Sequence, residues 1–133
     1  MGFFKDQVIE TKHFNGINSY VLPTNVKDVV TISGSILGGT LYSPSKNPQI
    51  STFTTAMLDK GTSNKDKYEI SDALDSVGAE LKFGCTKNHI YFTGHCLNSD
   101  VNMVIEILAD QLKTPAFRTV SYTHLTLPTI LLV

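Results

Sequence analysis

The sequence has few cysteines and few charged residues, and it contains no tryptophan. Its two cysteines, Cys85 and Cys96, are too few for a disulfide scaffold and fit no zinc-ribbon spacing, so we expect buried free thiols. Charged residues make up 17% of the chain and hydrophobic residues 41%, which argues against a disordered chain. The net charge of −1 leaves no basic excess for binding nucleic acid.

Membrane and export signals are also missing. No stretch approaches the roughly 20 continuous apolar residues of a membrane-spanning helix. The first residues, MGFFKD, lack the basic-then-apolar pattern of a signal peptide, which leaves bacterial periplasm and cytoplasm both open as compartments. A length of 133 residues corresponds to a single domain.

Hydrophobic periodicity and turn residues predict an α+β fold. Asn15-Gly16 is a hairpin signal, Asp66 and Glu69 resemble a capping box, and Gly78 stands where a helix commonly ends. We expect one mostly antiparallel sheet with helices packed on one face, a two-layer sandwich of order β-β-β-α-α-β-β-α. The predicted strands are 7–12, 16–22, 28–37, 79–86 and 89–96, and the predicted helices are 48–60, 66–77 and 98–112.

The last part of the chain differs in character from the rest. Residues 120–129 (VSYTHLTLPT) follow neither the helical nor the strand period, and they back-translate into ten codons that resemble the end of a transposase-based sequencing adapter. We therefore interpret residues 120–133 as an adapter-derived, non-native tail of a sequence assembled from environmental DNA. On this interpretation residues 1–119 are a partial domain, whose exposed apolar surface should favour self-association.

Several segments resemble the insulinase/pitrilysin family of zinc metallopeptidases. Residues 16–23 (GINSYVLP) are similar to the family's opening hairpin, and residues 57–64 (MLDKGTSN) to the segment that follows its catalytic helix. Residues 68–81 (YEISDALDSVGAEL) resemble the second helix and its exit, and His89 stands where the family has a histidine. The resemblance spans about residues 10–117 and implies the α+β fold of a metallopeptidase domain.

The zinc motif of that family is absent from the matching positions. The resemblance places the inverted motif His-x-x-Glu-His at residues 52–56, where this chain has TFTTA. Thr52 and Ala56 replace the two histidine ligands, and Thr55 replaces the glutamate that acts as general base. A threonine cannot accept and return a proton as a carboxylate does. We therefore expect no catalytic residue and no metal in this chain.

The resemblance implies two alternative roles. In the first, the chain is a non-catalytic domain of an insulinase-like peptidase, which shapes the peptide-binding chamber and packs against a catalytic half that alone carries zinc. That half would lie in the same chain or in a partner subunit. In the second, the domain is an assembly scaffold, like the related core subunits of respiratory complexes.

One segment could still contact peptide. In the family's active domain, substrate adds as a strand to the sheet edge that here corresponds to residues 82–86, so Lys82, Phe83 and Gly84 are candidate substrate-binding residues. Gly84 inside a strand indicates a bulge or a close backbone approach. His89 and His95 share one strand face but lie roughly 20 Å apart, too far for one metal ion.

Overall fold

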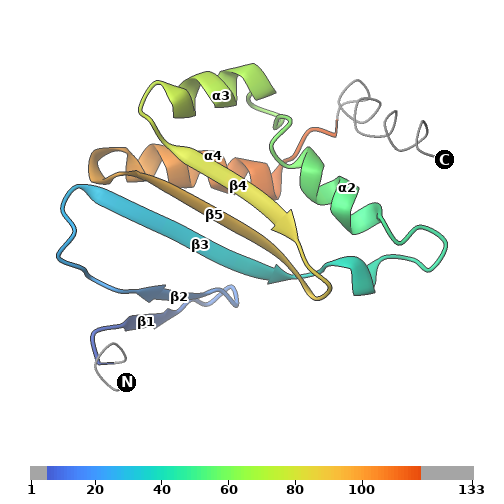
Figure 1. Cartoon of the computed structure of the whole chain (residues 1–133), viewed down its shortest axis with the longest axis horizontal. Coiled ribbons are helices and arrows are strands. Elements are labelled where there is room, and N and C mark those ends of the chain that lie inside the picture. Colours follow the sequence, from blue (N-terminus) through green and yellow to red (C-terminus); the bar gives the residue numbers. More distant parts are fainter. Residues whose placement is uncertain (1–5, 118–133) are drawn as a thin grey trace.

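A computed structural model of the chain describes residues 6–117. These residues form five strands, three helices and two short 3-10 turns, η1 (Thr40–Tyr42) and η2 (Asn98–Asp100) (Figure 1). The predicted tail, residues 120–133, lies outside the described residues. The elements are β1 (Ile9–Lys12), β2 (Asn18–Val21), β3 (Val29–Leu37), α2 (Ile50–Met57), α3 (Lys67–Asp75), β4 (Glu80–Cys85), β5 (His89–Leu97) and α4 (Val101–Lys113).

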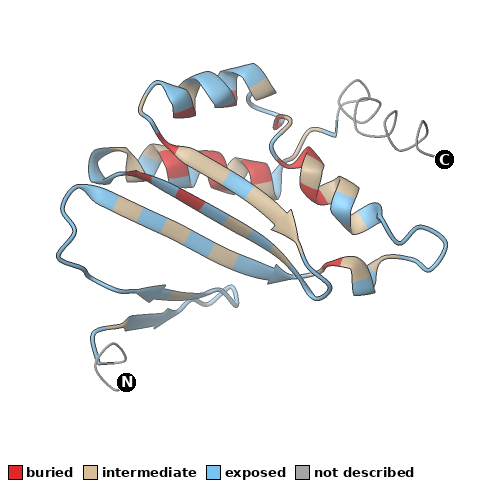
Figure 2. Cartoon of the chain, viewed as in Figure 1, coloured by how far each residue is buried: buried red, intermediate tan, exposed pale blue. Residues whose placement is uncertain are grey.

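The strands form two antiparallel sheets rather than one. β3, β5 and β4 pair in that order, so β5 is central and β3 and β4 are the edges. β1 and β2 form a separate two-stranded hairpin around Asn15-Gly16, where Gly16 has a φ of 88°. The hairpin side chains are almost all exposed (Figure 2), and within residues 6–117 neither hairpin strand pairs with the larger sheet.

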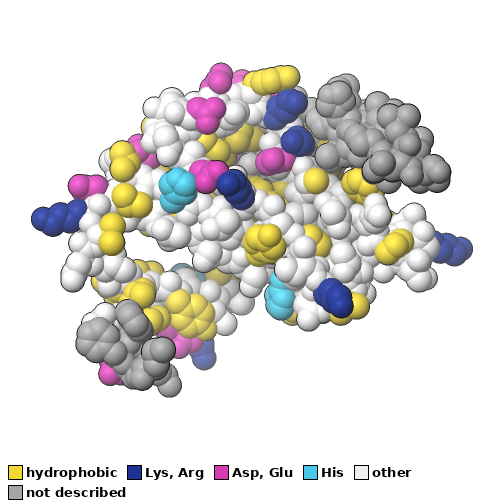
Figure 3. Space-filling model, in the orientation of Figure 1, with side chains coloured by type: hydrophobic (Ala, Val, Ile, Leu, Met, Phe, Trp, Pro, Cys, Tyr) yellow, Lys and Arg dark blue, Asp and Glu magenta, His cyan; other side chains and the backbone are white. Residues whose placement is uncertain are grey.

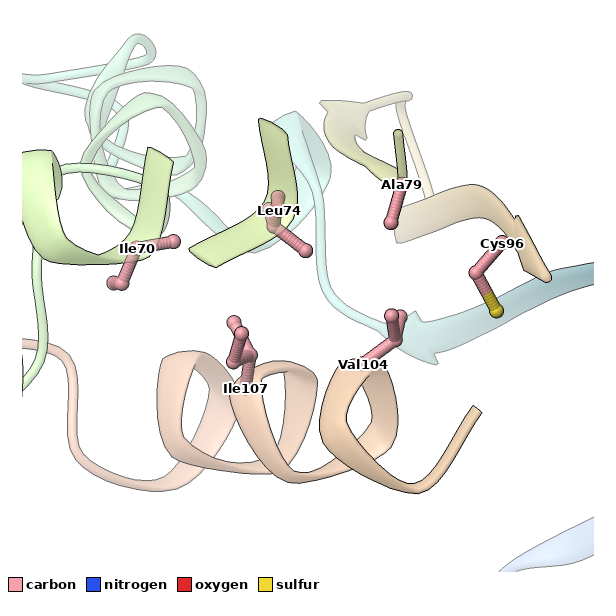
Figure 4. Packing of buried hydrophobic residues seen from close by; sticks show 6 residues of the cluster. All are labelled: Ile70, Leu74, Ala79, Cys96, Val104 and Ile107. Carbon is pink, nitrogen blue, oxygen red and sulfur yellow. The ribbon is translucent and has the colours of Figure 1, made fainter. Parts of the chain in front are cut away.

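The core lies between the three-stranded sheet and two of the helices. Side chains of α3 and α4 point toward one another and toward the ends of β4 and β5 (Figure 4). Val104 and Ile107 on α4 show the helical spacing that places residues on one face. The buried cluster consists of Ile70, Leu74, Ala79, Cys96, Val104 and Ile107.

Local signals in the sequence place the ends of α3. Asp66 accepts hydrogen bonds from the backbone N–H groups of Tyr68 and Glu69, both 2.9 Å long, and the Glu69 carboxylate accepts one from the Asp66 N–H. This is the complete capping box, which satisfies N–H groups that have no partner within the helix. Gly78 follows α3 with a φ of 65°, a left-handed conformation that favours glycine.

The fold class agrees with the prediction from sequence. Each predicted strand and helix is present, and the helices fall at the predicted places, although α2 is shorter than the predicted 48–60. The separation of the β1–β2 hairpin from the main sheet is a difference that strand patterns alone could not reveal. Periodicity identifies strands but does not say which strands pair.

Candidate functional site

Helix α2 carries Thr52, Thr55 and Ala56, the positions that the family resemblance assigns to the zinc motif. The helix lies beside the edge strand β4 (Figure 1). Thr52 is exposed, Ala56 is half-buried, and Thr55 is buried with 4% of its surface accessible. The three side chains therefore do not share one open surface, and none of them is a metal ligand of the usual type.

The hydroxyl groups around α2 are engaged with the backbone. Thr55 Oγ1 donates to the Ser51 carbonyl oxygen at 2.7 Å, within its own helix. Ser51 Oγ donates to the Gly39 carbonyl oxygen at 2.7 Å and lies 2.7 Å from Ser43 Oγ. These bonds tie α2 to the η1 turn, and they leave the Thr55 hydroxyl in a structural role.

No other part of the described chain supplies a metal site. Within residues 6–117, no three His, Cys, Asp or Glu side chains come together in a way that could hold a metal ion. His89 and His95 are both exposed on β5, on the face turned away from the core. The residues present at Thr52, Thr55 and Ala56 do not fit the zinc that the family resemblance implies for an active domain.

The candidate peptide-binding residues lie together on an edge strand. Thr86 N–H donates to the His89 carbonyl at 2.8 Å, so by strand alternation the even-numbered backbone groups of β4 face β5. The backbone N–H and C=O of Phe83 consequently face the free edge, beside α2. Lys82 is exposed, whereas Phe83 is half-buried on the core side. The fold places these residues on an edge strand of the described sheet, and their contact with peptide stays a prediction.

A glycine is needed at position 84 because an aromatic ring lies against it, and not because the strand has a β-bulge there. The register from Glu80 to Cys85 is regular, with Gly84 opposite Tyr91 on β5. The Tyr91 ring lies over the glycine and would overlap any β-carbon placed there. The close approach expected at Gly84 is thus made by a side chain, and the alternative of a bulge is wrong.

A small charged cluster on the outer face of the sheet was not anticipated. Lys82 Nζ lies 2.7 Å from Glu80 Oε1, and His95 Nδ1 lies 3.6 Å from Glu80 Oε2. The hydrogen bond from Lys82, followed by the charges of Lys82 and His95, lowers the pKa of Glu80. Only the i, i+2 spacing of Glu80 and Lys82 was visible in the sequence, because the third member comes from β5.

The two cysteines differ in environment. Cys96 is buried with 3% of its surface accessible, and this burial, with a smaller effect of the Asp100 charge, raises the pKa of its thiol. Cys85 is only half-buried, which departs from the expectation that both thiols are buried. Both are free, so neither contributes a disulfide.

One hollow opens between α3 and the start of β4. Its volume is about 200 Å³, and it is lined by residues such as Ile70, Ser71 and Leu81. Gln111 of α4 lies at this hollow with 1% of its surface accessible, and its Oε1 has no hydrogen-bond partner within the described residues. Charged side chains rim this face of the molecule (Figure 3).

No helix within residues 6–117 has the length and apolar character needed to cross a membrane. The candidate site is helix α2, with the positions that the resemblance assigns to the zinc motif, beside the edge strand β4.

Comparisons with known proteins find similarity to zinc proteases and to cytochrome b-c1 complex subunits. An uncharacterized zinc protease of Mycobacterium leprae (strain TN) is 34% identical over 58 residues, which is 44% of this chain and 13% of the relative. Subunit 2 of the human cytochrome b-c1 complex is 27% identical over 97 residues, 71% of this chain and 21% of the relative. Core protein I of the ubiquinol-cytochrome-c reductase complex of Euglena gracilis is 28% identical over 83 residues, which is 62% of this chain and 17% of the relative.

A solved structure shows the same fold. A crystal structure of a peptidase M16 inactive domain from Pseudomonas fluorescens superposes with a TM-score of 0.82 and 17% identity, covering 90% of this chain and 29% of that one. The chain spans only 13 to 21% of the length of the curated relatives described above. The model of the insulinase family (peptidase family M16) matches residues 20–125. The chain therefore belongs to the insulinase family, peptidase family M16.

Proposed function

We propose that this chain is a non-catalytic domain of an insulinase-like zinc metallopeptidase. In this role it packs against a catalytic half, in the same chain or in a partner subunit, and forms part of the wall of a peptide-binding chamber. The observation that carries the proposal is the state of α2. The helix that would hold zinc carries Thr52, Thr55 and Ala56, and the Thr55 hydroxyl is bonded to its own helix backbone.

The residues on α2 fit a domain that has the fold of the family but does not bind zinc. A zinc-bound water needs ligands with lone pairs available at neutral pH and a carboxylate to accept its proton. Threonine and alanine supply neither, whereas Thr55 packs and satisfies its hydroxyl locally. The similarity of this chain's fold to the solved structure of a peptidase M16 inactive domain supports the same proposal.

Metal content and peptide cleavage test the absence of catalysis. We expect the purified chain, after incubation with zinc and removal of free metal, to retain no stoichiometric zinc and to leave a set of quenched peptides uncut. An active zinc peptidase carried through the same steps is the positive control. Stoichiometric zinc, or cleavage that 1,10-phenanthroline abolishes, would overturn the proposal.

We also propose that extended peptides contact the β4 edge at Lys82, Phe83 and Gly84. The edge-facing backbone groups of Phe83 support this role, because strand addition uses main-chain hydrogen bonds. A titration of the ¹⁵N-labelled chain with an unstructured peptide should shift the Phe83 amide resonance first. The Gly84 amide, which faces β5, is the internal control. Equal shifts at both amides, or none, would contradict edge binding.

The second candidate role is an assembly scaffold without a peptidase partner. The similarity to cytochrome b-c1 complex subunits favours it. The coding DNA around this sequence separates the two roles. A His-x-x-Glu-His motif in the same reading frame, or in a neighbouring gene of the family, favours the peptidase, and its absence from both favours the scaffold.

A further inference from the structure

We propose that the hollow between α3 and the start of β4 binds a short linear diamine, with one ammonium group at each end of the hollow and the methylene chain between them. This role is independent of the peptidase or scaffold assignment and of peptide contact at the β4 edge. The observations that support it are the shape of the hollow, its apolar middle and the hydrogen-bonding groups at its two ends.

The hollow follows the length of α3. Its lining includes Lys67, the first residue of the helix, and Asp75, the last. These two residues lie about 12 Å apart along the helix axis. The volume of about 200 Å³ has room for roughly seven water molecules. The hollow therefore fits a small elongated ligand.

Apolar side chains line the middle of the hollow. Ile70 and Leu74 lie one turn apart on α3 and point toward Ile107 of α4 (Figure 4). Both are buried, and both line the hollow together with Leu81 of β4. Aliphatic side chains offer no hydrogen bond, and burial of apolar surface against them is favourable. The middle of the hollow therefore suits methylene groups and disfavours a charge.

Gln111 of α4 marks one end of the hollow. The end of α4 is bonded to the loop before α3, because the Ser63 N–H donates to the Thr114 carbonyl at 3.0 Å. Gln111 therefore lies near the start of α3. Only 1% of its surface is accessible, and its Oε1 has no hydrogen-bond partner within the described part of the chain. A buried acceptor without a donor is unfavourable, so this end favours a ligand with an N–H group.

The charges near the start of α3 are compatible with a ligand cation. Asp59, which precedes the same loop, lines the hollow and lies 3.6 Å from the Lys60 amine. Lys67 also lines the hollow, but its Nζ lies 5.0 Å from the centroid of the exposed Tyr68 ring. A cation is attracted to the face of an aromatic ring, so this contact favours a position of the Lys67 amine over Tyr68. The Gln111 oxygen is left for the ligand.

Asp75 marks the opposite end of the hollow. It is the last residue of α3, and the final turn of this helix has no basic residue. Ser71 Oγ donates to the Asp75 carboxylate at 3.3 Å, and no basic side chain within residues 6–117 forms an ion pair with it. The C-terminal end of a helix also carries partial negative charge. This end therefore attracts a cation.

The two ends together identify a diamine as the ligand. An ammonium group has three N–H donors and a positive charge, so one ammonium group can donate to Gln111 Oε1 and a second can pair with Asp75. The methylene chain between them would lie against Ile70 and Leu74. A monoamine can serve only one end, and an uncharged diol cannot neutralise the carboxylate.

Calorimetric titration of the chain with 1,5-diaminopentane measures this binding. Two ligands with the same carbon chain are the matched controls: 1-aminopentane lacks the second ammonium group, and 1,5-pentanediol lacks both charges. We expect the diamine to bind roughly ten-fold more tightly than 1-aminopentane, the effect of one charged hydrogen bond, and the diol not to bind. Equal affinities for the diamine and the monoamine, or no binding of the diamine, would overturn the proposal.

Variants at the two ends test the site itself. Gln111→Met and Asp75→Asn should each weaken diamine binding by roughly ten-fold. Asp72→Asn removes the same charge from an exposed position of α3 outside the lining, so this matched control should bind normally. Gln111→Met should also unfold at a higher urea concentration, because it removes the unpartnered oxygen, and its loss of binding is then not a loss of folding. Equal weakening by Asp75→Asn and Asp72→Asn, or full binding by Gln111→Met, would refute the site.

Discussion

Gly94 on β5 lies so close to the backbone of Glu80 on β4 that a β-carbon at Gly94 would overlap the Glu80 carbonyl oxygen. Gly84 is restricted differently, since its nearest neighbour is the ring of Tyr91. A backbone atom held in a sheet cannot withdraw, whereas a ring that is 43% exposed can rotate into solvent. Substitution by alanine should therefore be tolerated better at Gly84 than at Gly94.

The first prediction compares alanine at these two positions. Gly94→Ala should lower the free energy of unfolding by about 1–3 kcal/mol, the usual cost of overpacking. Gly84→Ala should cost clearly less. Urea denaturation followed by circular dichroism measures both. Equal losses, or a larger loss at Gly84, would show that the β4–β5 spacing is more adaptable than the structure indicates.

The second prediction concerns the capping box of α3. Asp66→Ala removes the acceptor for the Tyr68 and Glu69 N–H groups and should lower the free energy of unfolding by about 1 kcal/mol. Asp72→Ala, an exposed position inside the same helix, is the control and should change it by less than about 0.5 kcal/mol. If both variants unfold at the same urea concentration, Asp66 does not act as a cap.

The third prediction concerns restoration of the metal motif. Thr52→His, Thr55→Glu and Ala56→His together should produce no peptidase activity, because a catalytic zinc takes three protein ligands and these substitutions supply only two histidines. The triple variant should also be less stable, since position 55 is buried and a carboxylate there lacks a partner.

Histidines at 52 and 56 alone lie one helical turn apart and should bind zinc only weakly. Calorimetric titration of this double variant against Thr52→His measures that contribution. Zinc-dependent cleavage by the triple variant would contradict this prediction.

The fourth prediction concerns Glu80. Its pKa is lower in the folded chain than the ordinary value of 4.5, because Lys82 donates a hydrogen bond to its carboxylate. The unfolded chain therefore takes up the proton first as the pH falls. The stabilising contribution of this carboxylate is present above pH 4.5 and is lost as the pH falls through the lowered pKa.

Nuclear magnetic resonance titration of the Glu80 side chain measures this effect directly. Lys82→Met should raise the pKa of Glu80 toward its ordinary value. His95→Gln should raise it by a smaller amount, because the charge of His95 has the smallest influence. An unchanged pKa in Lys82→Met would show that the ion pair does not persist in solution.

The sequence alone determined the order of helices and strands and the identity of the residues at positions 52–56. Hairpin, capping and helix-end signals at Gly16, Asp66 and Gly78 depend on neighbours close in the chain, so the α+β order could be predicted from them. The absence of the zinc motif at residues 52–56 is likewise a matter of residue identity. Side chains that lack metal-binding groups do not gain them through folding.

Only the tertiary structure decided which strands pair and which groups meet. The separate β1–β2 hairpin, the Glu80–Lys82–His95 cluster and the strand order β3-β5-β4 depend on residues far apart in the sequence. A strand's alternation states which residues share a face, but its partner and register depend on long-range packing. For that reason the sequence could indicate which residues stand at the motif positions, and only the fold could show which side chains and strands lie together.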